Sequence, residues 1–377
     1  MAGLYYHIPF CKQACHYCDF HFSTQLKSKR SVISAMALEL ELRSHELTHP
    51  LKSIYFGGGT PSLLTSEEIA GLIEKGRNLG VAGPDIEITL EVNPDDVTPE
   101  RLREWKEAGI NRLSLGIQSF STRDLKFMNR AHDAEQAHQS LVWIARQFEN
   151  FSVDLIYGVP QTQGDSWAHN LAIIQEFRPP HLSCYALTRE SGTAMDKFIQ
   201  RGVMPEIDEE QAQREYQILI QWAQDLGYIN YEFSNFAFPG YESVNNSAYW
   251  SGLTYLGIGP SAHSFDGQTR SWNIANNSLY VKSLAEEKLP LTREKLSWVD
   301  HYNEYVMTRL RTANGIDLDE ITRLFDHKTR DNLVRMADKP IKQGLLVLKN
   351  GNLGVSKEGK FLTDGIASDL FLVNLDS

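Results

Sequence analysis

The first half of the chain alternates short β-rich runs with amphipathic stretches, and this alternation limits the folds open to it. The runs are LYYHI (4–8), SIYF (53–56), IEITLEV (86–92), RLSLGIQ (112–118), SVDLIYG (152–158) and HLSCYAL (181–187). Amphipathic stretches with helical spacing, such as 31–47, 66–80 and 98–109, lie between them. Because strand–helix alternation is typical of parallel strands covered by helices, we predict an α/β fold. Six units are too few for a complete eightfold barrel, which leaves a doubly wound sheet or an open, partial barrel.

Alternate residues of these strands fall on two chemically different faces. In 86–92 every second residue is aliphatic, and charged or hydroxyl side chains lie between them. We expect the aliphatic face to contact the helices and the small, polar face to line an interior with room for a polar ligand. Glu91, Gln118 and Asp154 lie late in their strands, where α/β folds place ligands. Any one of them could be a hydrogen-bonded structural residue, but three in register favour a site.

Three of the four cysteines lie within eight residues, at Cys11, Cys15 and Cys18, with C-x3-C-x2-C spacing. Zinc at this loop would need a fourth ligand such as His7, His16 or His21, whereas a four-iron cluster on three cysteines keeps one iron open. The spacing alone leaves zinc, a cluster and no metal as alternatives. The loop follows the first strand, so the thiols are expected at the same sheet edge as the three polar residues above. The second strand ends in GGGTP (57–61), which is not a phosphate-binding Walker loop because no Gly-Lys-Ser/Thr follows.

Composition narrows the classes of protein to consider. The formal net charge is −11, which gives no support for general nucleic-acid binding. No run approaches the ~18 apolar residues of an integral membrane segment, and the N-terminal residues lack a basic leader. We therefore expect a cytoplasmic location, where cysteines stay reduced or bind metal.

The rest of the chain changes character after about residue 190. Residues 195–230 have a helical pattern, and 231–275 indicate loops and short strands. From 299 a helix is expected, then two shorter helices, and a tight hairpin at Asn350-Gly351, which suggests a winged-helix-like module. We predict three parts, namely 1–190 as the barrel, 191–295 as its elaboration and 296–377 as a C-terminal helical module.

The cysteine motif, with Tyr17 just before its third cysteine and a GGTP loop after the second strand, resembles the radical S-adenosylmethionine (SAM) superfamily. LYYHIPFCKQACHYCDF, YFGGGTPS, LEVNP, RLSLGIQSF, VDLIYGVP and LGIGPSAHS are similar, in this order, to its coproporphyrinogen-oxidase-like branch over nearly the whole chain. That branch contains oxygen-independent coproporphyrinogen III oxidases and HemW-type heme chaperones. The resemblance implies a partial (β/α)6 radical-SAM barrel with a C-terminal helical, winged-helix-like module.

The resemblance also implies a site. Cys11, Cys15 and Cys18 would hold a [4Fe–4S] cluster whose open iron binds SAM. The residues carried over as contacts to SAM or the cluster are Tyr5, Tyr17, Gly58, Gly59, Thr60, Glu91, Gln118, Arg130, Asp154 and, as a looser match, Ala186. Cys184, inside the sixth run, is expected to be a packed thiol and not a ligand.

Two positions bear on the choice within the branch. The oxidases extend the motif with a further cysteine, and Phe20 at that position favours the HemW-type chaperones. That resemblance implies heme and an apo-hemoprotein acceptor as partners. A small electron-donor protein is a further candidate partner. The chaperones' H-N-x-x-Y-W motif, linked to heme, corresponds here to NNSAYW, so that Asn246, Tyr249 and Trp250 match and Asn245 replaces the histidine. His263 is a candidate replacement ligand, although a structural or surface role fits it better. The alternatives are a coproporphyrinogen III oxidase and a zinc-stabilised scaffold.

Overall fold

The computed structural model describes residues 2–80, 83, 85–160 and 165–373. Its centre is a curved sheet in which six strands pair in parallel and in chain order. These strands are β1 (Ala2–Ile8), β2 (Leu51–Gly58), β3 (Glu87–Val92), β4 (Arg112–Gln118), β5 (Phe151–Tyr157) and β6 (His181–Ala186). The helices between them are α1 (Lys29–Leu42), α2 (Ser66–Gly80), α3 (Pro99–Glu107), α4 (Thr122–Phe127), α5 (Ala134–Gln147) and α6 (Ser166–Phe177). The predicted α/β alternation is confirmed.

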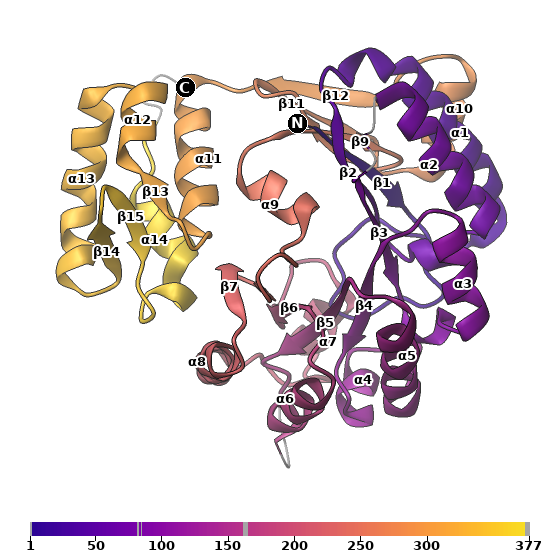
Figure 1. Ribbon diagram of the computed structural model, residues 1–377, viewed down its shortest axis with the longest axis horizontal. Helices are drawn as coiled ribbons and strands as arrows, with labels where there is room; N and C mark the ends of the chain where they lie inside the picture. The colour runs from indigo at the N-terminus through magenta and orange to yellow at the C-terminus, as the bar shows by residue number, and fades with distance from the viewer. Residues whose placement is uncertain (1, 81–82, 84, 161–164, 374–377) are drawn as a thin grey trace.

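The helices lie along the outer side of the sheet (Figure 1). Local sequence signals start them, such as a capping box between Asp133 and Gln136 at α5 and Thr98 before Pro99 at α3. The aliphatic strand residues, including Ile88, are fully buried in one core with the helices. The opposite strand face is polar, as predicted, and forms the inner surface of an open, partial barrel.

Both edges of this sheet are extended by the segment after residue 190. One edge continues from β1 through β9 (Thr254–Ile258), β10 (His263–Phe265), β11 (Thr269–Asn273) and β12 (Leu291–Lys295). The other continues from β6 through β8 (Asn235–Ala237) to β7 (Ile229–Glu232). The associated helices are α7 (Ala194–Gln200), α8 (Glu209–Asp225), α9 (Val244–Trp250) and α10 (Asn277–Ala285). The helical stretch expected over 195–230 is thus two helices with an interruption at 201–208, and its last residues begin β7.

Helix α9 lies on the inner side of the sheet, between its two extended edges and facing the C-terminal module (Figure 1). Its first turn is held from the barrel interior, because Val244 N and Asn245 N donate to the Glu87 carboxylate at 3.1 and 3.3 Å. An acidic group at this end of a helix also complements the helix dipole. Helix α9 therefore occupies the lateral opening of the partial barrel.

The C-terminal module has its own core, built around residues such as Tyr302, Ile321 and Leu333. It contains α11 (Trp298–Leu310), β13 (Ile316–Asp317), α12 (Leu318–Leu324), α13 (His327–Lys342), β14 (Leu346–Lys349), β15 (Asn352–Val355) and α14 (Thr363–Asp369). The predicted hairpin turn is present, with φ of 51° at Asn350 and 82° at Gly351. The expectation that both following helices are shorter than α11 is wrong for α13, which has 16 residues against 13 because Pro340 lies inside its last turns without ending it. The separate core is our basis for proposing a domain boundary near residue 296.

None of the described helices is both long enough and apolar enough to span a bilayer.

Candidate cofactor site and an adjoining cavity

The C-terminal ends of the strands surround a cavity of about 470 Å³, here called the thiol cavity, whose lining includes all three motif cysteines. Most residues singled out in the sequence meet there. Its walls include Cys11, Cys15, Cys18, Tyr17, Gly58, Gly59, Thr60, Glu91, Gln118, Arg130, Asp154 and Ala186. Phe20 also lines this cavity and is 63% exposed.

The cysteine loop is anchored to the segment that follows α4. Asn129 Nδ2 donates to Ala14 O at 2.7 Å, and His16 N donates to Met128 O at 3.1 Å. At the start of the loop, Cys11 N donates to Ser23 O at 3.1 Å. These bonds hold the backbone of the loop against the barrel, with the three half-buried thiols at the edge of the cavity.

Arg130 joins this loop to the barrel. Its Nη1 lies 3.4 Å from both Cys15 Sγ and the Tyr17 hydroxyl, and its Nη2 donates to Asn93 Oδ1 at 2.8 Å and to Gly116 O at 2.9 Å. Its buried Nε has no hydrogen-bond partner in the described part of the chain. Burial raises the pKa of the Cys11 thiol, and it raises that of Cys18 to about 12. A positive group close to the thiols is what bound thiolates require for stabilisation.

Two partly buried carboxyl groups face the same cavity from β3 and β5, the strands on either side of β4. Glu91 accepts a hydrogen bond from the Tyr55 hydroxyl at 2.8 Å, and burial, with a smaller contribution from Asp154, raises the pKa of Glu91 to about 8. Asp154 accepts bonds from Ser114 Oγ and Ser152 Oγ, and burial raises its pKa as well. Partly buried carboxyl groups that line a cavity suit a ligand that brings hydroxyl or amino donors.

The glycine loop is glycine-rich for a reason that the sequence did not reveal. A Cβ on Gly58 would lie 2.7 Å from the His7 ring, and one on Gly59 would lie 2.6 Å from Phe10 O. Gly58 also has a φ of +104°, which side chains other than glycine rarely adopt. Gly58 and Gly59 line the thiol cavity, but the space that a side chain would need is filled by the strand and loop that carry the cysteines.

The donor set fits an iron–sulfur cluster with one open iron, since a cluster distributes its thiolates over several irons whereas zinc collects its ligands on one ion. His7 Nε2, His16 Nδ1 and His21 Nε2 each contact another oxygen, at 3.0, 3.0 and 2.9 Å. Across the described residues, no three His, Cys, Asp or Glu side chains are arranged to hold a single metal ion. Cys184 is fully buried in the sheet core, as expected.

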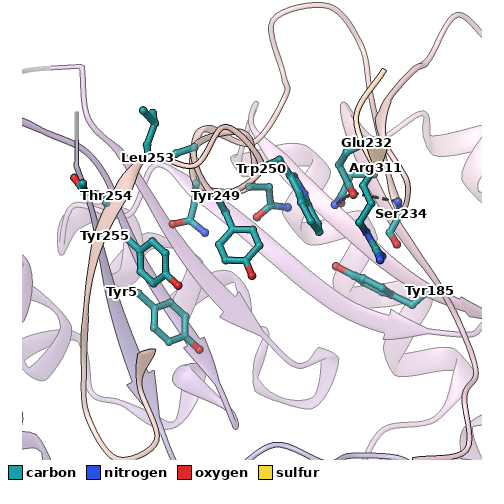
Figure 2. A pocket seen from close by; sticks show the side chains of 15 residues that line it. Tyr5, Tyr185, Glu232, Ser234, Tyr249, Trp250, Leu253, Thr254, Tyr255 and Arg311 are labelled. Carbon is teal, nitrogen blue, oxygen red and sulfur yellow. Dashed lines mark hydrogen bonds between the residues drawn. The ribbon is translucent and has the colours of Figure 1, made fainter. Parts of the chain in front are cut away.

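A second cavity of about 380 Å³, here called the aromatic cavity, lies over α9 in the lateral opening of the barrel. Figure 2 shows the rings of Tyr5, Tyr185, Tyr249, Trp250 and Tyr255 around it, with Glu232 and Arg311 at one side. The predicted heme region, Asn246, Tyr249 and Trp250, is therefore brought together here, and Asn245 lines the same cavity.

The two cavities adjoin, because Tyr185 and Asn246 line both. Tyr5 lines the aromatic cavity and is not among the residues of the thiol cavity, although its ring packs beside Tyr55 and its hydroxyl contacts His7 Nδ1 at 3.2 Å. His263 is exposed, stacks on Trp272 and lies outside the aromatic cavity, so the surface role fits it.

Sequence reasoning missed several residues of these sites. Arg112 lies on the same strand as Gln118, and counting every second residue back from Gln118 would have found it. Tyr55 lines the thiol cavity from β2, a strand in which no polar residue had been singled out. Glu87 belongs to the polar face of 86–92 that was expected to point inward, but the sequence suggested no function for it. Arg311 carried no sequence signal, because it reaches the aromatic cavity from the other module.

Comparison with known proteins agrees with this geometry. The radical SAM superfamily model matches residues 5–170, and the HemN C-terminal domain model matches residues 296–362. The heme chaperone HemW of Mycobacterium tuberculosis is 32% identical over 98% of this chain and 94% of its own. The mitochondrial radical S-adenosyl methionine domain-containing protein 1 of Mus musculus is 36% identical over 97% and 86%. Among solved structures, coproporphyrinogen III oxidase (HemN) from Escherichia coli covers 98% of this chain and 90% of its own with a TM-score of 0.84 at 24% identity, which confirms the fold.

Proposed function

The chain belongs to the heme chaperone HemW family of radical SAM proteins, and from this premise we propose that it binds heme in the aromatic cavity for delivery to an apo-hemoprotein. The observation that carries the proposal is the adjacency of the two cavities, which share Tyr185 and Asn246. A cytoplasmic location and a small electron-donor protein as a further partner are part of the same proposal.

In the thiol cavity, Cys11, Cys15 and Cys18 would ligate the [4Fe–4S] cluster, which with SAM bound to its open iron supplies one-electron chemistry. Arg130 would stabilise the thiolate charge through its contact with Cys15. Glu91 and Asp154, held by Tyr55 and by Ser114 and Ser152, would accept hydrogen bonds from SAM. Thr60, whose side chain is hydrogen bonded with Cys11, and Gln118 also line this cavity and would help to exclude water from the ligand.

In the aromatic cavity, the rings of Tyr249 and Trp250 would pack against a flat macrocycle. Tyr249 is 43% exposed and Tyr185 is 46% exposed, so the cavity opens to solvent and a ligand can enter and leave. Within the described part of the chain, the lining contains four phenols but no imidazole, thiol or thioether. A phenol is a known axial ligand for heme iron, so the loss of histidine at Asn245 does not remove every means of ligation.

Heme titration of the cluster-reconstituted protein under anaerobic conditions tests the proposal, with wild type and Asn245→His compared by absorption spectroscopy. We expect saturable binding by the wild type. We also expect binding by the variant that is about tenfold tighter, or ~1.4 kcal/mol, with an imidazole-type spectrum. Iron and acid-labile sulfide are measured on the same samples, because zinc without sulfide would instead indicate a structural metal site.

Absence of saturable binding by the wild type would contradict the heme proposal. Coproporphyrinogen III decarboxylation, measured with SAM and an electron donor, would then be the next assay. The exposed Phe20 at the edge of the thiol cavity offers no thiol for such chemistry.

A further inference from the structure

We propose that Arg311 binds a carboxylate of the ligand in the aromatic cavity, so that the C-terminal module takes part in recognising it. The inference rests on the heme function proposed above and names the chemical group that is recognised. Arg311 follows α11 directly, and it lines a cavity whose other described walls come from the sheet and α9. In the described lining it is the residue that carries a fixed positive charge.

The guanidinium of Arg311 is held between two rings. It lies 5.2 Å from the centroid of Trp250 on α9 and 5.1 Å from that of Phe233, between β7 and β8. Stacking on aromatic faces fixes the plane of a guanidinium and leaves its edges, which carry the N–H donors, free to point sideways. In Figure 2 the side chain of Arg311 extends along the cavity wall toward Tyr185.

The hydrogen-bonding capacity of Arg311 is only partly used. Its Nη1 donates to Asp364, whose side chain is 70% exposed. Its Nε is buried and has no hydrogen-bond partner among the described residues. An unpaired buried donor carries a free-energy cost, which a ligand carboxylate could remove. An ion pair to an exposed carboxylate is weak, so Asp364 is a poor competitor for such a ligand.

Glu232 is the acidic side chain in the described lining of the cavity, and one of its two oxygens is engaged while the other, Oε2, is buried without a hydrogen-bond partner. Glu232 Oε1 accepts a hydrogen bond from Ser234 N at 3.1 Å and another from Asn235 Nδ2. Burial raises the pKa of Glu232, which lowers its negative charge at a given pH. Among the described contacts no ion pair joins Glu232 to Arg311, although the charge of Arg311 acts against the rise in the pKa of Glu232, and Arg311 Nε keeps its N–H unpaired.

The segment that carries Arg311 is fixed against the cavity wall on both sides. Arg309 approaches Trp250 O and Ser251 O, at the C-terminal end of α9, at 3.4 Å. Ala313 N donates to Tyr231 O at 3.0 Å. These contacts hold Arg311 in place before a ligand arrives, which reduces the entropy cost of binding.

Flat aromatic walls beside one available guanidinium suit a planar ligand with a carboxylate on its rim. Heme has this chemistry, since its propionate groups are anionic and its ring is apolar. Heme dimethyl ester keeps the ring and the iron but has no carboxylate. Comparison of the two ligands therefore separates recognition of the carboxylate from recognition of the ring.

The test titrates both ligands into the cluster-reconstituted, full-length protein as wild type, Arg311→Met and Arg311→Lys. Arg323→Met is the matched control, because Arg323 is an exposed arginine of the same module. We expect the wild type and the control to prefer heme over the ester by about tenfold or more. Arg311→Met should weaken heme binding by about 10- to 100-fold and leave ester binding nearly unchanged. Arg311→Lys keeps the charge and should retain part of the preference.

Equal weakening of both ligands by Arg311→Met, or no change in either, would overturn the proposal and assign Arg311 a packing role. If Arg311→Met does not fold, as judged by its thermal unfolding, Arg311→Lys decides. A folded lysine variant without any preference for the free acid would overturn the proposal, and a reduced preference would support it. Failure of the wild type to bind either ligand would instead overturn the heme function and this inference with it.

Discussion

The thiol cavity and the aromatic cavity share a wall but are built in opposite ways. The thiol cavity is formed by strand ends that follow one another in the sheet, and its charged groups, such as Arg130 and Asp154, are hydrogen bonded to neighbouring elements. The aromatic cavity gathers residues from β1, β6, α9 and the C-terminal module, and some of its rings are nearly half exposed. The first arrangement suits a cofactor that stays bound, and the second suits a cargo that must leave.

The largest effect should come from the thiols. Cys15→Ser removes one of three ligands and the partner of Arg130, and it should lower bound iron by about an order of magnitude, since outer-sphere changes alone cost roughly 10–100-fold in metal affinity. Iron and sulfide analysis after anaerobic reconstitution is the measurement, with Cys184→Ala as the control. If the cavities are as distinct as their construction indicates, heme affinity should change far less. Equal loss of heme binding would break the comparison.

An intermediate effect is expected at Glu87, which holds α9 from inside the barrel. Glu87→Gln weakens the bonds to Val244 N and Asn245 N and leaves the buried Arg112, 3.8 Å away, without its counter-charge. We expect a loss of about 2 kcal/mol in unfolding free energy. Heme affinity should fall more than SAM affinity, because α9 forms the floor of the aromatic cavity.

Urea unfolding and parallel titrations of heme and SAM measure these effects. Glu100→Gln, at an exposed position that pairs with Arg103 at 3.4 Å, is the control. A variant that loses SAM binding but keeps heme binding would show that Glu87 serves the thiol cavity instead.

The smallest effect, counted per pH unit, concerns the pH dependence of stability. Burial raises the pKa of Glu91 from 4.5 to about 8, so the folded state favours its protonated form. The stabilisation from this group is complete below about pH 4.5 and is lost as the pH rises through about 8. In the cofactor-free protein, Glu91→Gln should therefore reduce the fall in stability over this interval by at most ~1.4 kcal/mol per pH unit.

Urea unfolding at several pH values measures this slope, with the exposed Glu294→Gln as the control. A slope unchanged by Glu91→Gln would mean that Glu91 stays ionised in the folded protein. The negative charge of Glu91 would then be stabilised by its neighbours in the thiol cavity before any ligand binds.

Much of this molecule could be predicted from residues close together in the chain. The period-two pattern of β3 and β4 separated a core face from a polar face, and Asn350-Gly351 specified its own turn. The thiol cavity followed from these patterns, because parallel strands bring their C-terminal ends to one edge. The interruption at 201–208 was missed although it has local signals, namely Gly202 with a φ of 69°, Pro205 and the N-cap residue Asp208. The full length of α13 was also missed, and this helix continues through Pro340.

The sequence by itself determined the alternation of strands and helices, the polar interior and the cysteine loop, because spacing along the chain sets which side chains share a face or a turn. Only the tertiary structure decided the aromatic cavity, where Tyr5, Tyr185, Trp250 and Arg311 meet from four segments. It also decided why Gly58 must be glycine, since the atoms that exclude a side chain belong to His7, about fifty residues earlier. Contacts between distant segments depend on how whole elements pack, and no local pattern in the sequence records that packing.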